Sequence, residues 1–136
     1  MIEIYTDGGY SIPKNKGAWA FAISESEYRY GKVNNSTSNR MELTAIIEAI
    51  LYAKESYPQA PIKIYSDSKY CVNGFTYWMY GWEKNNWLRV NGEPLLNIDL
   101  WKQLYSLRQN VTLTWVKGHS GDNMNTFVDK LCSVRY

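Results

Sequence analysis

The chain has 136 residues and a mass of 15.8 kDa, so we expect residues 1–136 to form a single domain. Its composition, 45% hydrophobic and 21% charged, excludes low-complexity disorder, and its net charge of +2 excludes a histone-like polycation. No apolar stretch approaches the roughly 20 residues of a membrane span. No signal peptide is visible, and Cys71 and Cys132 stand far apart, as is typical of buried free thiols. We therefore expect a cytoplasmic protein without a membrane partner.

Three short strands are expected at the N-terminus, over residues 2–6, 17–24 and 27–33. The first strand is expected to end at a turn formed by Asp7, Gly8 and Gly9. The third strand is more polar, which favours the edge of a sheet. Because the connections between the three strands are short, they predict an antiparallel meander.

A long helix is expected from about residue 39 to 55, where apolar residues recur at helical spacing. A strand over 62–66 follows, and then a short helix that Ser68 can cap. After a Trp-rich segment at 76–87, we expect a helix to about 109, a strand over 111–116 and a last helix from about 124. This order predicts a mixed α/β sheet with helices on its faces. The tryptophans expected in its core are Trp19, Trp101 and Trp115.

Four acids stand at the ends of predicted strands or inside predicted helices: Asp7, Glu42, Asp67 and Asp129. If the strand over 62–66 pairs beside the first strand, Asp7 and Asp67 become neighbours, and Glu42 can reach them from the long helix. Clustered carboxylates raise each other's pKa, and a divalent cation is the usual compensation. Oxygen ligands favour Mg²⁺ or Mn²⁺ over Zn²⁺. Two such ions about 4 Å apart can activate a water and stabilise a leaving oxygen in phosphoryl displacement.

Each acid also has a structural alternative. Asp7 before two glycines is typical of a turn, and Asp67 before the next helix is typical of an N-cap. Glu42 follows Asn39 at the spacing of a capping box, and Asp129 could form an ion pair on a helix flank. Only the common placement of all four favours the metal site.

Four sequence blocks carry a family resemblance: Ile4-Tyr5-Thr6-Asp7-Gly8-Gly9, Thr37-Ser38-Asn39-Arg40-Met41-Glu42-Leu43, Tyr65-Ser66-Asp67-Ser68-Lys69-Tyr70, and Trp115-Val116-Lys117-Gly118-His119-Ser120-Gly121 followed by Asn125 and Asp129. In order and spacing they resemble the signature blocks of type 1 ribonuclease H. Trp78, Trp82 and Trp87 also stand where the bacterial enzymes carry a substrate-binding protrusion, the basic handle. The resemblance covers almost the whole chain.

The resemblance implies an endonuclease that hydrolyses the RNA strand of RNA–DNA hybrids and leaves 5′-phosphate and 3′-hydroxyl ends. It implies an α/β, ribonuclease H-like fold with a five-stranded mixed sheet, three antiparallel strands and then parallel strands, flanked by helices. It also implies that Asp7, Glu42, Asp67 and Asp129 are catalytic and hold two Mg²⁺ ions, for which Mn²⁺ can substitute. His119 would assist proton transfer or product release, which an ordinary imidazole pKa of about 6.5 suits. Without the motif, His119 is equally typical of an exposed loop histidine.

Candidate substrate contacts lie beside the acids. Gly8 and Gly9 would let the backbone approach an RNA strand and its 2′-hydroxyls. Asn39 and Arg40 can donate hydrogen bonds to bases or phosphates. Thr37 could hold a DNA phosphate at the helix N-terminus, cap the helix, or do both.

Trp78 and Trp82 share a helix face, and they predict either core packing against Trp101 or an aromatic surface for the DNA strand. From residue 78 to 108 the chain has four basic and three acidic residues, a net charge of +1, so this handle is less basic than the bacterial pattern. Weaker hybrid binding is expected from it. The remaining predicted substrate contacts are Ser38, Lys69, Lys84 and Asn125.

Two other classes of function stay open. One is a non-catalytic hybrid-binding module, which the presence of all four acids disfavours. The other is a different nuclease with this general fold, such as a junction resolvase or a transposase core, which the tryptophan handle and the block from Asn39 to Glu42 disfavour. The favoured interpretation is a Mg²⁺-dependent ribonuclease H that acts on hybrids as a monomer.

Overall fold

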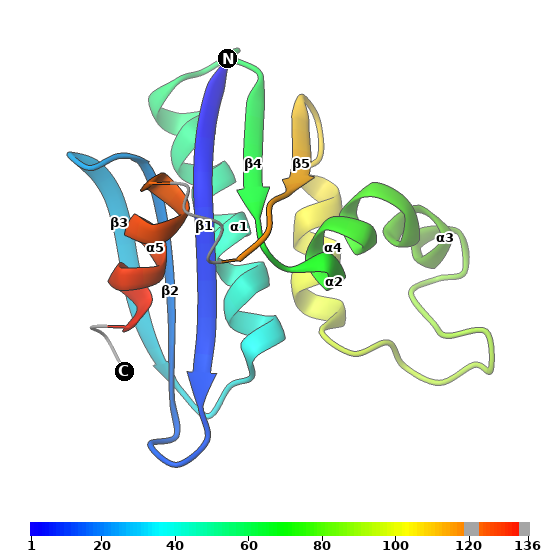
Figure 1. Cartoon of the computed structure of the whole chain (residues 1–136). Helices are drawn as coiled ribbons and strands as arrows, with labels where there is room; N and C mark the ends of the chain where they lie inside the picture. The colour runs from blue at the N-terminus through cyan, green and yellow to red at the C-terminus, as the bar shows by residue number, and fades with distance from the viewer. Residues whose placement is uncertain (119–122, 134–136) are drawn as a thin grey trace.

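Five strands form one mixed sheet in a computed structural model that describes residues 1–118 and 123–133, apart from the side chain of residue 123. The order of the strands is β3-β2-β1-β4-β5 (Figure 1). Their bounds are Ile2–Ser11 for β1, Lys16–Ser24 for β2, Glu27–Asn34 for β3, Ile62–Ser66 for β4 and Val111–Trp115 for β5. The first three strands are antiparallel, whereas β1, β4 and β5 are parallel. The predicted five-stranded mixed sheet is therefore confirmed.

The helices cover the sheet from two sides. Helix α1 (Ser38–Ser56) packs on one face, and α5 (Asn123–Ser133) lies on the opposite face, over β1 and β2 (Figure 1). Alternation along β2 explains this division, because Phe21 joins the α1 side of the core while Ala18 and Ala20 pack against Cys132 of α5. The remaining helices are α2 (Lys69–Asn73), the π-helical turn η1 (Gly74–Trp78), α3 (Met79–Lys84) and α4 (Ile98–Ser106).

Strand β1 is longer than predicted. Asp7, Gly8 and Gly9 do not form a turn, because Gly8 pairs with Trp19 and Gly9 with Ala18 as β1 continues to Ser11. Gly8 is required there by a close approach of two elements. A Cβ atom at Gly8 would lie 2.4 Å from the backbone carbon of Met41 in α1. Gly8 thus allows α1 to pack closely, and neither glycine reverses the chain.

The main core lies between α1 and the sheet, and it extends to α2 and α4. Trp101 is fully buried in it, as predicted, and Trp19 packs partly buried against it. The prediction for Trp115 is wrong: this side chain is 42% exposed, because it stands at the last residue of β5, which is an edge strand of the sheet. Cys71 and Cys132 are free and buried, as expected. Among the described residues, no helix has the length and apolarity needed to cross a membrane.

Candidate active site

Three carboxylates converge at the point where β4 ends. Asp7 lies inside β1, Glu42 lies in the second turn of α1, and Asp67 follows β4 directly. The parallel register pairs Tyr5 with Tyr65, so Asp7 and Asp67 each stand two residues further along neighbouring strands. One carboxylate oxygen from each of the three acids lies within 4.8 Å of the others. The predicted meeting of Asp7, Glu42 and Asp67 therefore occurs.

The electrostatics of this cluster favour a bound cation. Burial raises the pKa of Asp7 to about 7, and the negative charge of Asp67 adds to the increase. Burial also raises the pKa of Glu42 well above its ordinary value, and the charges of Asp7 and Asp67 add to it. The backbone N–H of Gly8 donates to Glu42 Oε1. Three oxygen ligands that repel one another in a nearly buried place suit Mg²⁺ or Mn²⁺.

The fourth predicted acid reaches the cluster from the other face of the sheet. Asp129 lies in α5, and both its side-chain contact and its charge help to raise the pKa of Asp7. Asn125, on the same helix, is buried with 5% of its surface exposed. His119 lies outside the described residues, so its predicted role stays a prediction.

The turn that carries Asp67 is held by two serines. Ser66 Oγ accepts a hydrogen bond of 3.1 Å from the Ser68 N–H, and Ser68 Oγ caps α2 by accepting from the Cys71 N–H at 3.1 Å. The capping role predicted for Ser68 is confirmed. Gly118 lies against the same acid, since a Cβ atom there would be 3.1 Å from Asp67 Oδ2. The sequence predictions did not include Ser66 as a residue that supports the turn, although its place directly before Asp67 could have indicated this role.

The N-terminus of α1 is capped by Thr37, whose Oγ1 accepts a hydrogen bond of 3.1 Å from the Arg40 N–H. The capping alternative for Thr37 is confirmed. The capping-box alternative for Glu42 is wrong, because Thr37 is the N-cap and the Glu42 carboxylate contacts the Gly8 N–H. Ser38 and Asn39 are exposed beside this cap.

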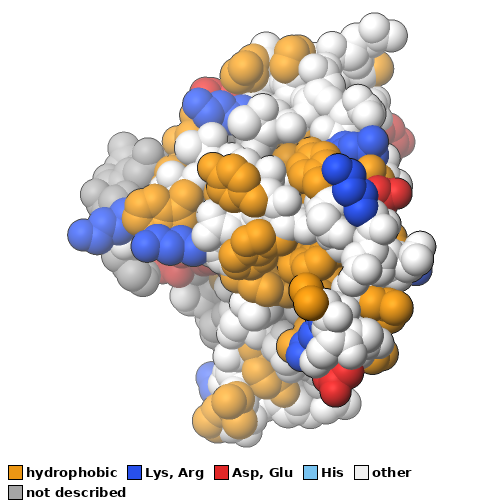
Figure 2. Space-filling model, turned by 90° about the vertical axis from the view of Figure 1, so that its right-hand side faces the viewer, with side chains coloured by type: hydrophobic (Ala, Val, Ile, Leu, Met, Phe, Trp, Pro, Cys, Tyr) orange, Lys and Arg blue, Asp and Glu red, His pale blue; other side chains and the backbone are white. Residues whose placement is uncertain are grey.

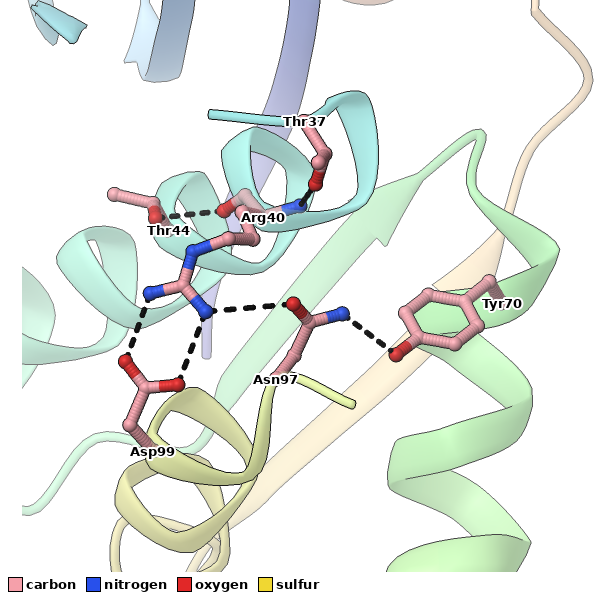
Figure 3. A network of polar contacts seen from close by, with 6 residues as sticks. All are labelled: Thr37, Arg40, Thr44, Tyr70, Asn97 and Asp99. Atoms are coloured by element: carbon pink, nitrogen blue, oxygen red, sulfur yellow. Dashed lines mark hydrogen bonds and ion pairs between the residues drawn. The ribbon is translucent and has the colours of Figure 1, made fainter. Parts of the chain in front are cut away.

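Arg40 belongs to a polar network that links three helices (Figure 3). Its guanidinium donates two hydrogen bonds to the Asp99 carboxylate, at 3.0 and 2.8 Å, and a third to Asn97 Oδ1 at 3.3 Å. Asn97 in turn donates to the Tyr70 hydroxyl at 3.1 Å, as does the indole of buried Trp101 at 3.0 Å. Arg40 thus has a structural partner besides its predicted role toward substrate. Tyr70 was overlooked, because nothing in its local sequence indicates contacts so distant along the chain.

The Trp-rich segment forms a separate surface, here called the handle, over η1, α3 and the loop that follows. Trp82 packs against Trp101 with ring centroids 5.1 Å apart, whereas Trp78 is 43% exposed. The predicted packing against Trp101 is therefore confirmed for Trp82, whereas contact of the exposed Trp78 ring with a DNA strand stays a prediction. Apolar side chains gather in the middle of this face of the molecule, with Lys and Arg side chains and some acidic ones around them (Figure 2). A groove of about 610 Å³ opens there, lined by Tyr77, Trp78, Gly81, Trp82, Asn85, Leu88, Arg89 and Val90.

The other predicted substrate contacts are distributed around these two places. Gly9 lies within β1, and the exposed Lys69 begins α2 directly after the turn that carries Asp67. Lys84 is exposed at the end of α3. The structure thus brings the acids together at one place and the handle residues together at another.

Comparisons with known proteins agree on one family. The sequence model described as "RNase H" matches residues 1–135. The chain is 42% identical to the "Ribonuclease H" of Orientia tsutsugamushi (strain Boryong), over 97% of this chain and 80% of that protein. It is 40% identical to the "Ribonuclease H" of Rickettsia typhi, over 96% of this chain and 87% of that protein.

Solved structures share the fold at lower sequence identity. One, described as "LC9-RNase H1, a type 1 RNase H with the type 2 active-site motif", superposes with a TM-score of 0.77 at 24% identity, over 97% of this chain and 70% of the other. Another, a foamy viral protease-reverse transcriptase in complex with dsDNA, has a TM-score of 0.83 at 19% identity, over 96% of this chain and 90% of the other. At this identity the likeness shows the fold alone.

Proposed function

This chain belongs to the ribonuclease H family of hydrolases, and we propose that it is an endonuclease that cuts the RNA strand of RNA–DNA hybrids. The observation that carries this proposal is the convergence of Asp7, Glu42 and Asp67 within 4.8 Å, at the carboxyl end of β4. A cluster of this kind is costly to keep without a cation, so its presence in the fold indicates metal-dependent chemistry.

We propose that Asp7, Glu42, Asp67 and Asp129 hold two Mg²⁺ ions, for which Mn²⁺ can substitute. When bound, such a pair supplies an activated water and a stabilised leaving oxygen, which yields 5′-phosphate and 3′-hydroxyl ends. The role of the protein is to hold the carboxylates in place. Strand β1 holds Asp7, α1 holds Glu42, and the Gly8 N–H orients the Glu42 carboxylate.

His119 is proposed to assist proton transfer or product release. It follows Gly118 in the sequence, and Gly118 lies against the Asp67 carboxylate. The proximity of Gly118 to the acids supports this role.

The substrate is proposed to lie across the acids and the handle. Gly8, Gly9 and the residues 37–40 border the acids on the side of α1, and Lys69 borders them on the side of α2. Trp78 offers an exposed ring toward the DNA strand, with Trp82 packed beneath it and Lys84 at the end of α3. We further propose that residues 1–136 act as one domain, as a monomer in the cytoplasm, where two free buried thiols are ordinary.

A panel of four substrates tests the proposal. Labelled RNA–DNA hybrid, duplex DNA, duplex RNA and single-stranded RNA are each incubated with the protein and Mg²⁺. We expect cutting of the hybrid alone, in its RNA strand. Cutting of duplex DNA instead would indicate another nuclease of this fold, and binding of the hybrid without cutting would indicate a non-catalytic module.

A further inference from the structure

Three contacts connect the last residue of β5 and the residues that follow it to the end of β4. The N–H of Val116 donates to the carbonyl oxygen of Ser66 at 2.9 Å. The indole Nε1–H of Trp115 donates to the carbonyl oxygen of Asp67 at 3.3 Å. Gly118 lies against the carboxylate of the same aspartate. All three contacts thus fall on Asp67 itself or on Ser66, the residue that precedes it.

Asp67 needs such support more than its neighbours do. Of the three clustered acids, Asp7 lies inside a strand paired on its β2 side and Glu42 lies inside a 19-residue helix, whereas Asp67 follows the last residue of β4. A backbone outside regular structure has fewer hydrogen bonds to fix it, and a metal ligand must be held within a fraction of an ångström. A hydrogen bond to the Asp67 carbonyl restricts this backbone directly.

Trp115 is placed for contact and not for burial. Its side chain stays 42% exposed, so removal from water accounts for only part of its position. Its N–H faces Asp67, and its ring carries the ammonium group of Lys69 4.9 Å from a ring centroid. One side chain therefore contacts the backbone of a candidate metal ligand and a cation on the substrate side of α2.

We propose that Trp115 is a positioning residue with two separable parts: its indole N–H fixes Asp67 for cation binding, and its ring face orients Lys69 toward the nucleic acid. This inference rests on the proposed function for its second part. Its first part concerns cation binding alone, which can be measured without any substrate.

The two parts predict different results for two variants. Trp115→Phe keeps a ring face but loses the N–H, so we expect about tenfold more Mg²⁺ for half-maximal cutting, at the lower end of the effects typical of residues behind metal ligands. Its KM for the hybrid in saturating Mg²⁺ should not change. Trp115→Leu loses both parts, so the KM should rise as well. Lys69→Gln should raise the KM without changing the Mg²⁺ dependence.

A calorimetric readout makes the test independent of cutting. Mg²⁺ at a concentration c that binds only the folded protein stabilises it by RT ln(1 + c/Kd), so the Mg²⁺ concentration at which the Tm begins to rise reports cation affinity. For Trp115→Phe this onset should move to higher Mg²⁺ by the same factor as the activity curve. Trp19→Phe is the matched control, because Trp19 packs on Phe21 and on the backbone of Gly31, away from the acids.

Two results would overturn the inference: Mg²⁺ curves of Trp115→Phe that coincide with those of the wild type, or an equal displacement in Trp19→Phe. An unchanged KM in Trp115→Leu would contradict the second part, that the ring face orients Lys69 toward the nucleic acid. If the wild-type protein leaves hybrids uncut, the proposed function fails, while the calorimetric comparison still decides the first part.

Discussion

At the scale of single residues, the charge of Asp7 depends on its surroundings. Its pKa is raised from 3.8 to about 7, by burial first and by the charge of Asp67 second. The folded protein therefore holds a proton here that the unfolded chain releases above pH 4. The resulting contribution to stability is fully present below pH 4 and is lost as the pH rises through 7. Without a cation, Asp7 destabilises the folded protein at pH 8.

This loss of stability with rising pH leads to a prediction for Asp7→Asn. In EDTA at pH 8 the variant should have a higher Tm than the wild type, by about 5 °C, because the amide removes a buried charge. At pH 5 the difference should be smaller, because Asp7 is then protonated in the folded wild type and ionised only in its unfolded chain. Scanning calorimetry at both pH values checks this. A Tm difference that is the same at pH 5 and pH 8 would contradict it.

At the scale of the elements, the distance between β1 and α1 depends on Gly8. A Cβ atom there would meet the backbone of Met41 and of Glu42 at 2.4 to 2.5 Å, and backbone cannot move aside as a side chain can. We expect Gly8→Ala to lower the free energy of unfolding by about 2 kcal/mol or more and to displace Glu42. Urea denaturation measures the loss.

Gly81→Ala is the matched control, because a Cβ atom at Gly81 in α3 meets nothing within 4 Å. Alanine should stabilise this helix position by about 0.5–1 kcal/mol. If both variants lost stability equally, a general intolerance of glycine replacement would explain the result, and the close approach of β1 and α1 would not.

The junction of α2 with α4 depends on the Tyr70 hydroxyl. It accepts from the Trp101 indole, which is fully buried, and from Asn97. Tyr70→Phe should therefore cost about 1–3 kcal/mol of stability, because a buried donor loses its acceptor. Denaturation of Tyr70→Phe, of Trp101→Phe and of the double variant measures the coupling. If the double variant lost as much stability as the two single variants together, the hydrogen bond between Tyr70 and Trp101 would contribute nothing.

Sequence patterns predicted some elements better than others, for physical reasons. The helix α1 and the strands β4 and β5 follow from local periodicity and from proline, and the sequence predicted them within one residue. The continuation of β1 through Asp7, Gly8 and Gly9 could not be predicted, because it depends on pairing with β2 and on packing against Met41. Likewise, the partnership of Arg40 with Asp99 joins residues 59 positions apart. The meeting of the three acids was predictable, since it needed only the pairing of β1 with β4.

At the scale of the whole molecule, the handle differs in character from the acid cluster. Its groove is mostly apolar, with Arg89 as its charged lining residue, and Lys84 stands nearby on α3. Stacking should therefore contribute more to hybrid binding there than neutralisation of phosphates does.

Two variants separate stacking from charge. Trp78→Ala should weaken hybrid binding about tenfold or more without changing its salt dependence. Lys84→Ala should reduce the slope of log K against log salt by about 0.9, the value for one phosphate contact. Fluorescence anisotropy in EDTA, over a range of NaCl concentrations, measures both quantities. A changed slope in Trp78→Ala would show that the tryptophan acts by placing charges.

Strand-specific cutting of one hybrid tests the central claim, that the acid cluster performs metal-dependent hydrolysis of RNA. The RNA strand and the DNA strand carry different labels, and single-turnover cutting is followed with Mg²⁺ and with EDTA, for the wild type and for Asp7→Asn. The account predicts RNA fragments with 3′-hydroxyl ends from the wild type in Mg²⁺ alone, an intact DNA strand, and no cutting by a folded Asp7→Asn. Cutting by Asp7→Asn at the wild-type rate, or by the wild type in EDTA, would contradict it.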